Sequence, residues 1–181
     1  HVCSLRPGVP RLTLSALLEF DAEGRQRSGR LCESWIASRV KLSYEAAETL
    51  LGGGEPAPEH LATHSGEESG EAAWPGARPW AEQRAAAGAA LADMRHLARL
   101  LRERRFAAGS LDIDTPEYKV RHDARGHITA IDERPDLESY RIIEEFMLAA
   151  NQFVARSLAA QLPAARVQTL HTDALVLRVV E

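Results

Sequence analysis

Apolar residues recur at helical spacing on almost every side of the segment from Arg141 to Leu158. At about 100° per residue they form two adjacent stripes. One stripe comprises Ile142, Phe146, Ala149 and Phe153. The other comprises Ile143, Met147, Ala150, Val154 and Leu158. A consistent polar edge is made by Glu138, Arg141, Glu145, Gln152 and Arg156. A helix with so much apolar surface is expected to be largely enclosed by the rest of the fold.

Two polar residues of this helix, Glu144 and Asn151, fall on a different stripe, which they share with Tyr140. We therefore expect one carboxylate and one amide to face an interior or a cleft. Burying an uncompensated carboxylate is costly, so Glu144 should have a charged partner, a raised pKa or a functional role. Asp136, which follows Pro135, is expected to cap the start of the helix.

The N-terminal part of the chain predicts a hairpin. Apolar and polar residues alternate from Leu12 to Glu19, and the pattern resumes from Arg27 to Ile36. The residues Asp21 to Gly24 between these runs are typical of a tight turn. The predicted element is therefore a pair of antiparallel strands.

The next segment predicts a strand that leads directly into a helix. The run 39–44 (RVKLSY) alternates so that Arg39 and Lys41 share one face. Ser43 is suited to cap a short helix that ends near Leu51. Tyr44 is thus expected at the junction between strand and helix.

The segment 52–79 is rich in Gly, Pro, Glu, Ser and Ala and has no hydrophobic periodicity, which predicts a flexible insertion. A long helix is predicted from about residue 80 to 106. Several arginines lie near its end, where the helix dipole favours cations; they are Arg99, Arg102, Arg104 and Arg105. A solvated face is the favoured interpretation of these arginines, and contact with phosphate is the alternative.

Further strands are predicted over 110–114, 118–122 and 127–132, the last two joined by the turn 123–126. The tail is weakly strand-like over 174–180. Together the patterns predict an α+β fold in which antiparallel hairpins of a mixed or antiparallel sheet pack against two or three long helices.

Composition narrows the function classes only slightly. The chain has 181 residues, 45% of them hydrophobic, and a formal charge of −4, so any contact with a polyanion must be a local patch. Cys3 and Cys32 show neither a disulfide framework nor metal spacing, which favours reduced thiols. No apolar run reaches the roughly 18 residues of a membrane helix. We expect an intracellular protein, located in the cytoplasm, and a chain starting at His1 is expected to be a piece of a longer one.

Metal and phosphate motifs are weak. His60 and His64 have the spacing of two ligands on a helix, but they lie in the predicted insertion and no third ligand is implied. Residues 52–54 are glycines but lack the Lys and Ser or Thr of a phosphate loop. The acidic group Asp112, Asp114 and Glu117 could hold magnesium, although solvated acids beside a turn are the favoured interpretation. We therefore predict no metal site in this chain.

Four segments, in order along the chain, carry a resemblance to a known family. They read CSLRPGVPRLTLSALLEFDAEG (3–24), SRVKLSYEAAETLL (38–51), GSLDIDTPEYKV (109–120) and RIIEEFMLAAN (141–151). This set resembles the RNB catalytic domain of the ribonuclease R and ribonuclease II family of 3′–5′ exoribonucleases. The resemblance covers residues 1–165 as the central part of such a domain, whereas residues 166–181 diverge.

The resemblance implies roles for individual residues. Tyr44 resembles the tyrosine that packs against a nucleotide near the RNA 3′ end, and Glu144 the glutamate that holds the terminal ribose. Ile113 stands where some relatives place an aromatic that clamps bases. With these three, Arg39 and Lys41 complete the expected RNA-binding residues. A carboxylate that accepts from a 2′-hydroxyl would distinguish RNA from DNA.

The resemblance also implies chemistry that this sequence lacks. The family binds magnesium through clustered aspartates that have no match here, so Mg²⁺ is expected only in the complete enzyme, with no ligand and no catalytic residue in this chain. The complete enzyme would hydrolyse single-stranded RNA to nucleoside 5′-monophosphates, and this chain alone would be inactive. We expect no DNA or membrane partner and a monomer.

Two alternatives remain open at this stage. The first is a non-catalytic RNA-binding or scaffold protein derived from an RNB domain. The second is an unrelated soluble α+β domain. That second alternative predicts that Tyr44 and Glu144 lie far apart, whereas the nuclease hypothesis requires them to border one channel.

Overall fold

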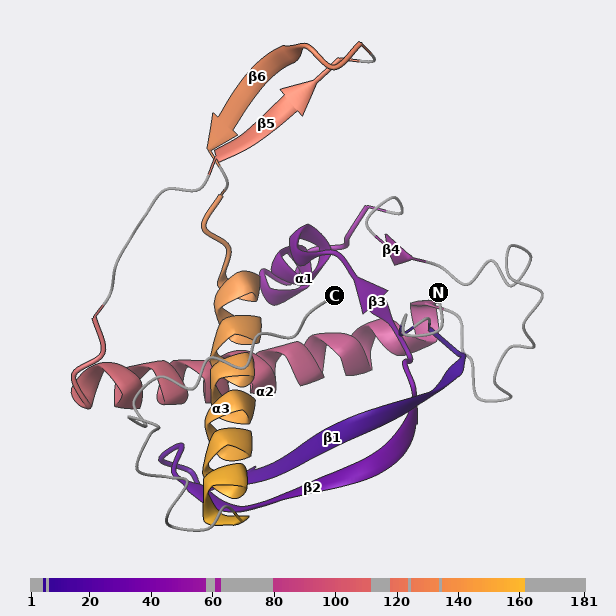
Figure 1. Ribbon diagram of the computed structural model, residues 1–181. Coiled ribbons are helices and arrows are strands. Elements are labelled where there is room, and N and C mark those ends of the chain that lie inside the picture. The colour runs from indigo at the N-terminus through magenta and orange to yellow at the C-terminus, as the bar shows by residue number, and fades with distance from the viewer. Residues whose placement is uncertain are drawn as a thin grey trace.

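The computed structural model describes residues 5, 7–57, 61–62, 80–111, 118–123, 125–133 and 135–161. Its elements are β1 (Pro10–Phe20), β2 (Gln26–Ala37), β3 (Lys41–Leu42), α1 (Tyr44–Leu51), β4 (Leu61–Ala62), α2 (Trp80–Ala107), β5 (Tyr118–His122), β6 (Ile128–Glu133) and α3 (Glu138–Gln161), as Figure 1 shows. Within these residues the strands form three antiparallel pairs, β1–β2, β3–β4 and β5–β6. The predicted α+β class, with hairpins and long helices, is confirmed.

The long β1–β2 hairpin follows from the alternation of more and less exposed residues, which is clearer on β1 than on β2. Its register pairs Leu12 with Trp35, and it shifts beside Phe20, where the strands enter the turn. The carboxylate of Asp21 accepts hydrogen bonds from the backbone N–H groups of Glu23 (3.1 Å) and Arg25 (2.7 Å). The hydrogen bond from Arg25 is the main reason that the pKa of Asp21 lies below its usual value. The turn is therefore fixed by its own side chain.

Two glycines let this hairpin approach the helices. Gly24, in the turn, has a φ of +69°, and a Cβ there would lie 2.8 Å from Cβ of Leu100 on α2. Gly29 lies on β2, and a Cβ at this position would be only 2.6 Å from the ring of Phe153 on α3. The hairpin is thus pressed against both long helices at its turn end.

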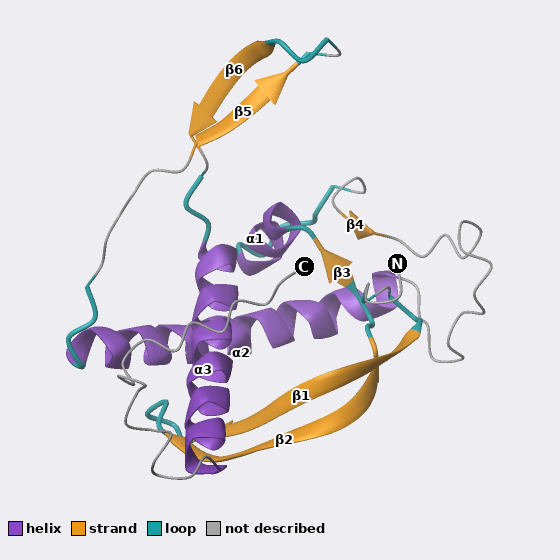
Figure 2. Ribbon diagram, viewed as in Figure 1, coloured by secondary structure: helices purple, strands orange, loops and turns teal. Residues whose placement is uncertain are grey.

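The two long helices cross each other (Figures 1 and 2). At the crossing, Ala98 of α2 and Ile142 of α3 are both almost completely buried. The small alanine allows close approach of the helix axes, which lets the larger isoleucine fill the space between them. The core of the described residues is small, and it comprises this crossing together with the buried Ala46 and Ala47 of α1.

Hydrogen bonds join helix α1 to the start of α3. The side chain of Ser43 caps α1 by accepting from the N–H of Ala46, as predicted. Ser139, in the first turn of α3, donates from its backbone N–H to Oε2 of Glu48 and from its hydroxyl to the carbonyl of Tyr44, both over 3.0 Å. A carboxylate from α1 therefore satisfies an unpaired N–H at the start of α3.

The expected cap of α3 by Asp136 is wrong. Asp136 instead accepts a hydrogen bond from Nε of Arg141 over 3.1 Å. Its role is filled by Glu48, which is distant in sequence, so local pattern could not identify the acceptor. Arg141 in turn holds the segment before α3 against the first turn of the helix.

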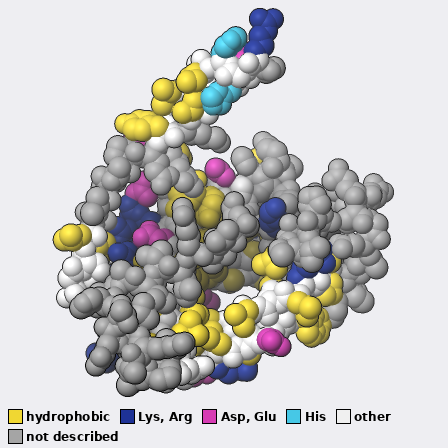
Figure 3. Space-filling model, viewed as in Figure 1, with side chains coloured by type: hydrophobic (Ala, Val, Ile, Leu, Met, Phe, Trp, Pro, Cys, Tyr) yellow, Lys and Arg dark blue, Asp and Glu magenta, His cyan; other side chains and the backbone are white. Residues whose placement is uncertain are grey.

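The β5–β6 hairpin extends away from the crossing helices (Figure 1), and its hydrophobic and histidine side chains are exposed (Figure 3). Tyr118, Ile128 and Ile131 are each more than 60% exposed. At its tip the carboxylate of Asp123 accepts from the backbone N–H of His127, which is the main reason that its pKa is lowered. The predicted hairpin and turn are confirmed, but few side chains of the hairpin are covered.

Some boundaries differ from the prediction. The strand expected over 39–44 is reduced to β3, although Arg39 and Lys41 are exposed while Val40 and Leu42 are partly covered, as the alternation predicted. The expected insertion 52–79 includes β4, which pairs with β3. Ser110 and Leu111 are not part of a strand. Ile113, the whole acidic group (Asp112, Asp114 and Glu117) and the strand predicted over 174–180 lie outside the described residues.

We expect Gly24→Ala to destabilise the protein by about 3 kcal/mol, because it adds both left-handed backbone strain and a clash with Leu100. Gly53→Ala is a matched control, since Gly53 has a φ of +78° but open space around it. The control should cost only about 1 kcal/mol from strain. Urea unfolding followed by circular dichroism measures both. Equal losses would show that the close approach of turn and helix is unimportant.

Candidate nucleic-acid interface

Tyr44 lies at the first position of α1, where the Ser43 cap fixes the direction of the chain. Its side chain is 39% exposed, and its ring packs against that of Tyr140 on α3, with centroids 4.3 Å apart and planes tilted by 44°. This tilted contact is favourable and holds one side of the Tyr44 ring. The exposed part of the ring remains available to a ligand.

Tyr140 connects Tyr44 to Glu144. The two α3 residues are four apart, so their side chains lie on the same face of the helix, one turn from each other. We call the surface formed by Tyr44, Tyr140 and Glu144 the Tyr44–Glu144 face. Glu144 thus lies one helical turn from the residue that the Tyr44 ring contacts.

The expected burial of Glu144 is wrong. Its side chain is 57% exposed, whereas that of the adjacent Glu145, which we had placed on the polar edge, is only 4% exposed. One residue corresponds to a rotation of about 100° around the helix. Because α3 is apolar on nearly every side, its periodicity did not determine which glutamate faces α2.

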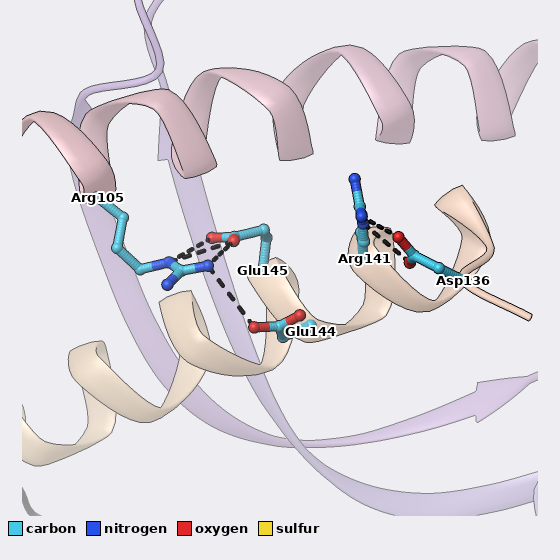
Figure 4. Close-up of polar contacts among 5 residues, drawn as sticks. All are labelled: Arg105, Asp136, Arg141, Glu144 and Glu145. Carbon is cyan, nitrogen blue, oxygen red and sulfur yellow. Dashed lines mark hydrogen bonds and ion pairs between the residues drawn. The ribbon is translucent and has the colours of Figure 1, made fainter. Parts of the chain in front are cut away.

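Arg105 of α2 is the partner that determines this orientation (Figure 4). Its Nε lies 3.2 Å and 3.3 Å from the two carboxylate oxygens of Glu145, and its Nη2 also bonds to Glu145. The same Nη2 lies 3.6 Å from Oε1 of Glu144. One guanidinium thus neutralises a buried carboxylate and restrains the exposed one beside it.

A pocket of about 320 Å³ opens between α2 and the first turns of α3, where basic and acidic side chains lie together (Figure 3). Its rim includes Arg99, whose Nε donates to Oε1 of Glu138 over 2.9 Å. This hydrogen bond is the largest cause of the lowered pKa of Glu138 and of the raised pKa of Arg99. The charges here are paired within the protein, so the pocket itself has little excess charge.

The other predicted residues are placed as follows. Arg39 and Lys41 are exposed on the segment that leads to Tyr44, and Asn151 is half-buried on α3. Ile113, His60 and His64 lie outside the described residues. In the part of the chain that the structure describes, no helix is long and apolar enough to cross a membrane.

The described carboxylates do not suit a magnesium ion. Across residues 7–57, 80–111 and 118–161, leaving out those not described, no group of three or more His, Cys, Asp or Glu residues could hold a metal. The adjacent Glu144 and Glu145 both face Arg105, whose positive charge would repel a cation. The Tyr44–Glu144 face offers a partly exposed aromatic ring and a hydrogen-bond acceptor.

Sequence reasoning missed Arg105 and Glu48, and it assigned no function to Tyr140. The spacing of Tyr140 from Glu144 was a usable signal, because an aromatic ring one turn away is its neighbour. No local signal identified Arg105, since it was one of several arginines near the end of the same helix.

Comparison with known proteins gives the family. The family model of the RNB domain matches residues 1–173 of this chain. The chain belongs to the RNB domain family. This membership excludes the unrelated α+β domain.

Among curated RNB relatives, ribonuclease R of Aquifex aeolicus is 32% identical over 157 residues, which make up 87% of this chain and 19% of the relative. Ribonuclease R 1 of Lactococcus lactis is 29% identical over 88% of this chain and 17% of the relative. The chain therefore spans about a fifth of the length of these relatives.

Solved structures of RNase R from Mycoplasma genitalium share the fold. The complex with ribose methylated single-stranded RNA has a TM-score of 0.67 and 20% identity, and it covers 88% of this chain and 21% of its own. The complex with double-stranded RNA has a TM-score of 0.69 and 19% identity, and the match covers 88% of this chain and 24% of the RNase R chain. These RNB neighbours establish the arrangement of hairpins and helices described above.

We expect Arg105→Ala to destabilise the fold by about 3 kcal/mol, because it leaves the Glu145 carboxylate buried without a partner. Glu144→Ala, the matched control one residue away, should cost less than about 0.5 kcal/mol because that side chain is exposed. The double variant Arg105→Met with Glu145→Met should recover most of the loss. Urea unfolding at constant pH tests all three. Equal effects of the two single variants would contradict the assignment of the buried acid.

Proposed function

We propose that this chain forms part of the RNA channel of a 3′–5′ exoribonuclease that hydrolyses single-stranded RNA to nucleoside 5′-monophosphates. Membership of the RNB family supports the class of enzyme. The observation that supports the assignment of a site is the packing of the Tyr44 ring against Tyr140, which lies one helical turn from Glu144. A stacking surface and a carboxylate acceptor are what a terminal ribonucleotide requires.

Each residue of the face has a distinct proposed role. The exposed part of the Tyr44 ring packs against a base near the RNA 3′ end, which is compatible with any sequence because every base has a flat face. The Glu144 carboxylate accepts a hydrogen bond from the ribose 2′-hydroxyl. Tyr140 is a positioning residue for Tyr44, and Arg105 holds Glu144 close to its place. Arg39 and Lys41 supply positive charge for the RNA backbone on the approach to Tyr44.

In this proposal, RNA is cleaved by parts of the complete enzyme other than the residues that the structure describes. Magnesium in the complete enzyme would supply activated water and stabilise charge on the cleaved phosphate. The carboxylates on the described surface do not fit such an ion, so this chain is proposed to bind and orient RNA. Location in the cytoplasm, a monomeric state and the absence of DNA and membrane partners belong to the same proposal.

We expect Glu144→Ala to abolish discrimination of the 2′-hydroxyl, because the acceptor is removed while the fold is kept. The measurement is fluorescence anisotropy with two single-stranded RNAs that differ only in a 2′-deoxy terminal nucleotide. The original chain should prefer the all-ribose strand by about tenfold, and the variant should bind both equally. Tyr44→Ala should weaken both strands about tenfold, whereas Tyr44→Phe should retain binding.

Two outcomes would contradict the assignment of the face. One is unchanged discrimination in Glu144→Ala, and the other is equal weakening by Tyr44→Ala and Tyr44→Phe. Thermal unfolding of each variant shows whether a loss of binding reflects a loss of folding.

We expect no shortening of 5′-labelled single-stranded RNA by this 181-residue chain in the presence of Mg²⁺, because the described carboxylates hold no metal cluster. Denaturing gel electrophoresis measures this directly. Stepwise shortening that is abolished by a chelator would show that the chain carries its own metal centre and would contradict the proposed division of roles.

A further inference from the structure

A second pocket, of about 410 Å³, opens between the β1–β2 turn, the end of α2 and the last turns of α3. Its lining is rich in positively charged and amide side chains; these are Arg104, Arg105, Arg156, Gln26 and Gln152. The pocket contains one carboxylate, Glu145, which is buried. The protein as a whole has a negative formal charge, so this concentration of guanidinium groups is a local exception.

The three arginines of this pocket differ in how their charges are used. Arg105 is neutralised by Glu145, as described above. Arg156 donates from Nη2 to Oε1 of Gln26 over 2.9 Å, which is a neutral acceptor and leaves the charge uncompensated. Arg104 forms no ion pair with any carboxylate in the described part of the chain. Two guanidinium charges therefore face the pocket without a compensating acid.

The same short turn positions both of these side chains. Arg104 lies beside the β1–β2 turn, where a Cβ on Gly24 would be 3.5 Å from Cδ of Arg104. Gln26, two residues later, holds the guanidinium of Arg156. The hairpin thus lies against one cationic side chain from each long helix, and its hydrogen bond to Arg156 lowers the entropic cost of binding a ligand there.

A phosphate group fits this arrangement best. Guanidinium groups match the geometry of phosphate oxygens and can donate two parallel hydrogen bonds to them. Gln152 on the rim adds an amide that can donate to a further oxygen. A carboxylate ligand would meet the same charges, but it has fewer oxygens for two guanidinium groups and an amide.

We propose that the pocket between the β1–β2 turn, α2 and α3 is a phosphate-binding site in which Arg104 and Arg156 hold the phosphate group. The group can come from a free nucleoside monophosphate or from the backbone of an RNA strand. Arg105 links the pocket to Glu144, because its guanidinium lies 3.6 Å from that carboxylate and also lines the pocket. The site is nevertheless independent of the Tyr44–Glu144 face in the residues that form it.

The test compares two double variants that remove the same charge. Arg104→Ala with Arg156→Ala removes the proposed clamp, whereas Arg121→Ala with Arg125→Ala removes two arginines from the distant β5–β6 hairpin. Calorimetric titration measures the affinity for free adenosine 5′-monophosphate, with uncharged adenosine as the blank. Fluorescence anisotropy at several salt concentrations measures the affinity for single-stranded RNA, whose backbone supplies the phosphate. Circular dichroism confirms that both variants fold.

We expect the clamp variant to lose at least tenfold in affinity for one of these ligands, and the hairpin variant to bind like the original chain. Loss of nucleoside monophosphate binding identifies a free nucleotide as the source of the phosphate. Loss of RNA binding alone, with a shallower salt dependence, identifies the backbone. Equal affinities of the two double variants for both ligands would overturn the proposal, while discrimination of the 2′-hydroxyl by Glu144 would still stand or fall separately.

Discussion

The buried ion pair between Arg105 and Glu145 is the interaction on which the arrangement of the long helices depends. A carboxylate that is almost completely covered is costly without a cation, so the pair favours the rotational setting of α3 that turns Glu145 toward Arg105 of α2. That setting directs Glu144 outward and places Tyr140 against Tyr44. Shape packing at Ala98 and Ile142 alone would tolerate neighbouring rotations, because α3 is apolar on most of its circumference. The ion pair thus supplies specificity more than stability.

The sequence was sufficient to predict the elements that depend on local pattern. Alternation predicted the β1–β2 and β5–β6 hairpins, and Ser43 was correctly identified as the cap of α1. Local pattern failed wherever a distant residue decides the outcome. Glu48 replaces Asp136 at the start of α3 although 91 residues separate it from Ser139. Likewise, the choice between Glu144 and Glu145 depends on Arg105, which sequence spacing does not connect to either.

The resemblance to the RNB family selected Tyr44 and Glu144 as site residues, but it did not predict how the two side chains are held. Glu144 is held at the surface by a shared guanidinium and is not enclosed. The arginines near the end of α2 show the same limit. Arg104 and Arg105 line the same pocket, but only Arg105 is paired with the buried Glu145.

The hydrogen bond between Glu48 and the backbone of Ser139 has a consequence for motion. It joins the beginning of one helix to the middle of another, so the ring of Tyr44 and the first turn of α3 are expected to open together and not separately. Fraying of that turn would release Tyr140 and Tyr44 in a single step. The surface that carries both tyrosines would then behave as one cooperative unit, either assembled or lost as a whole.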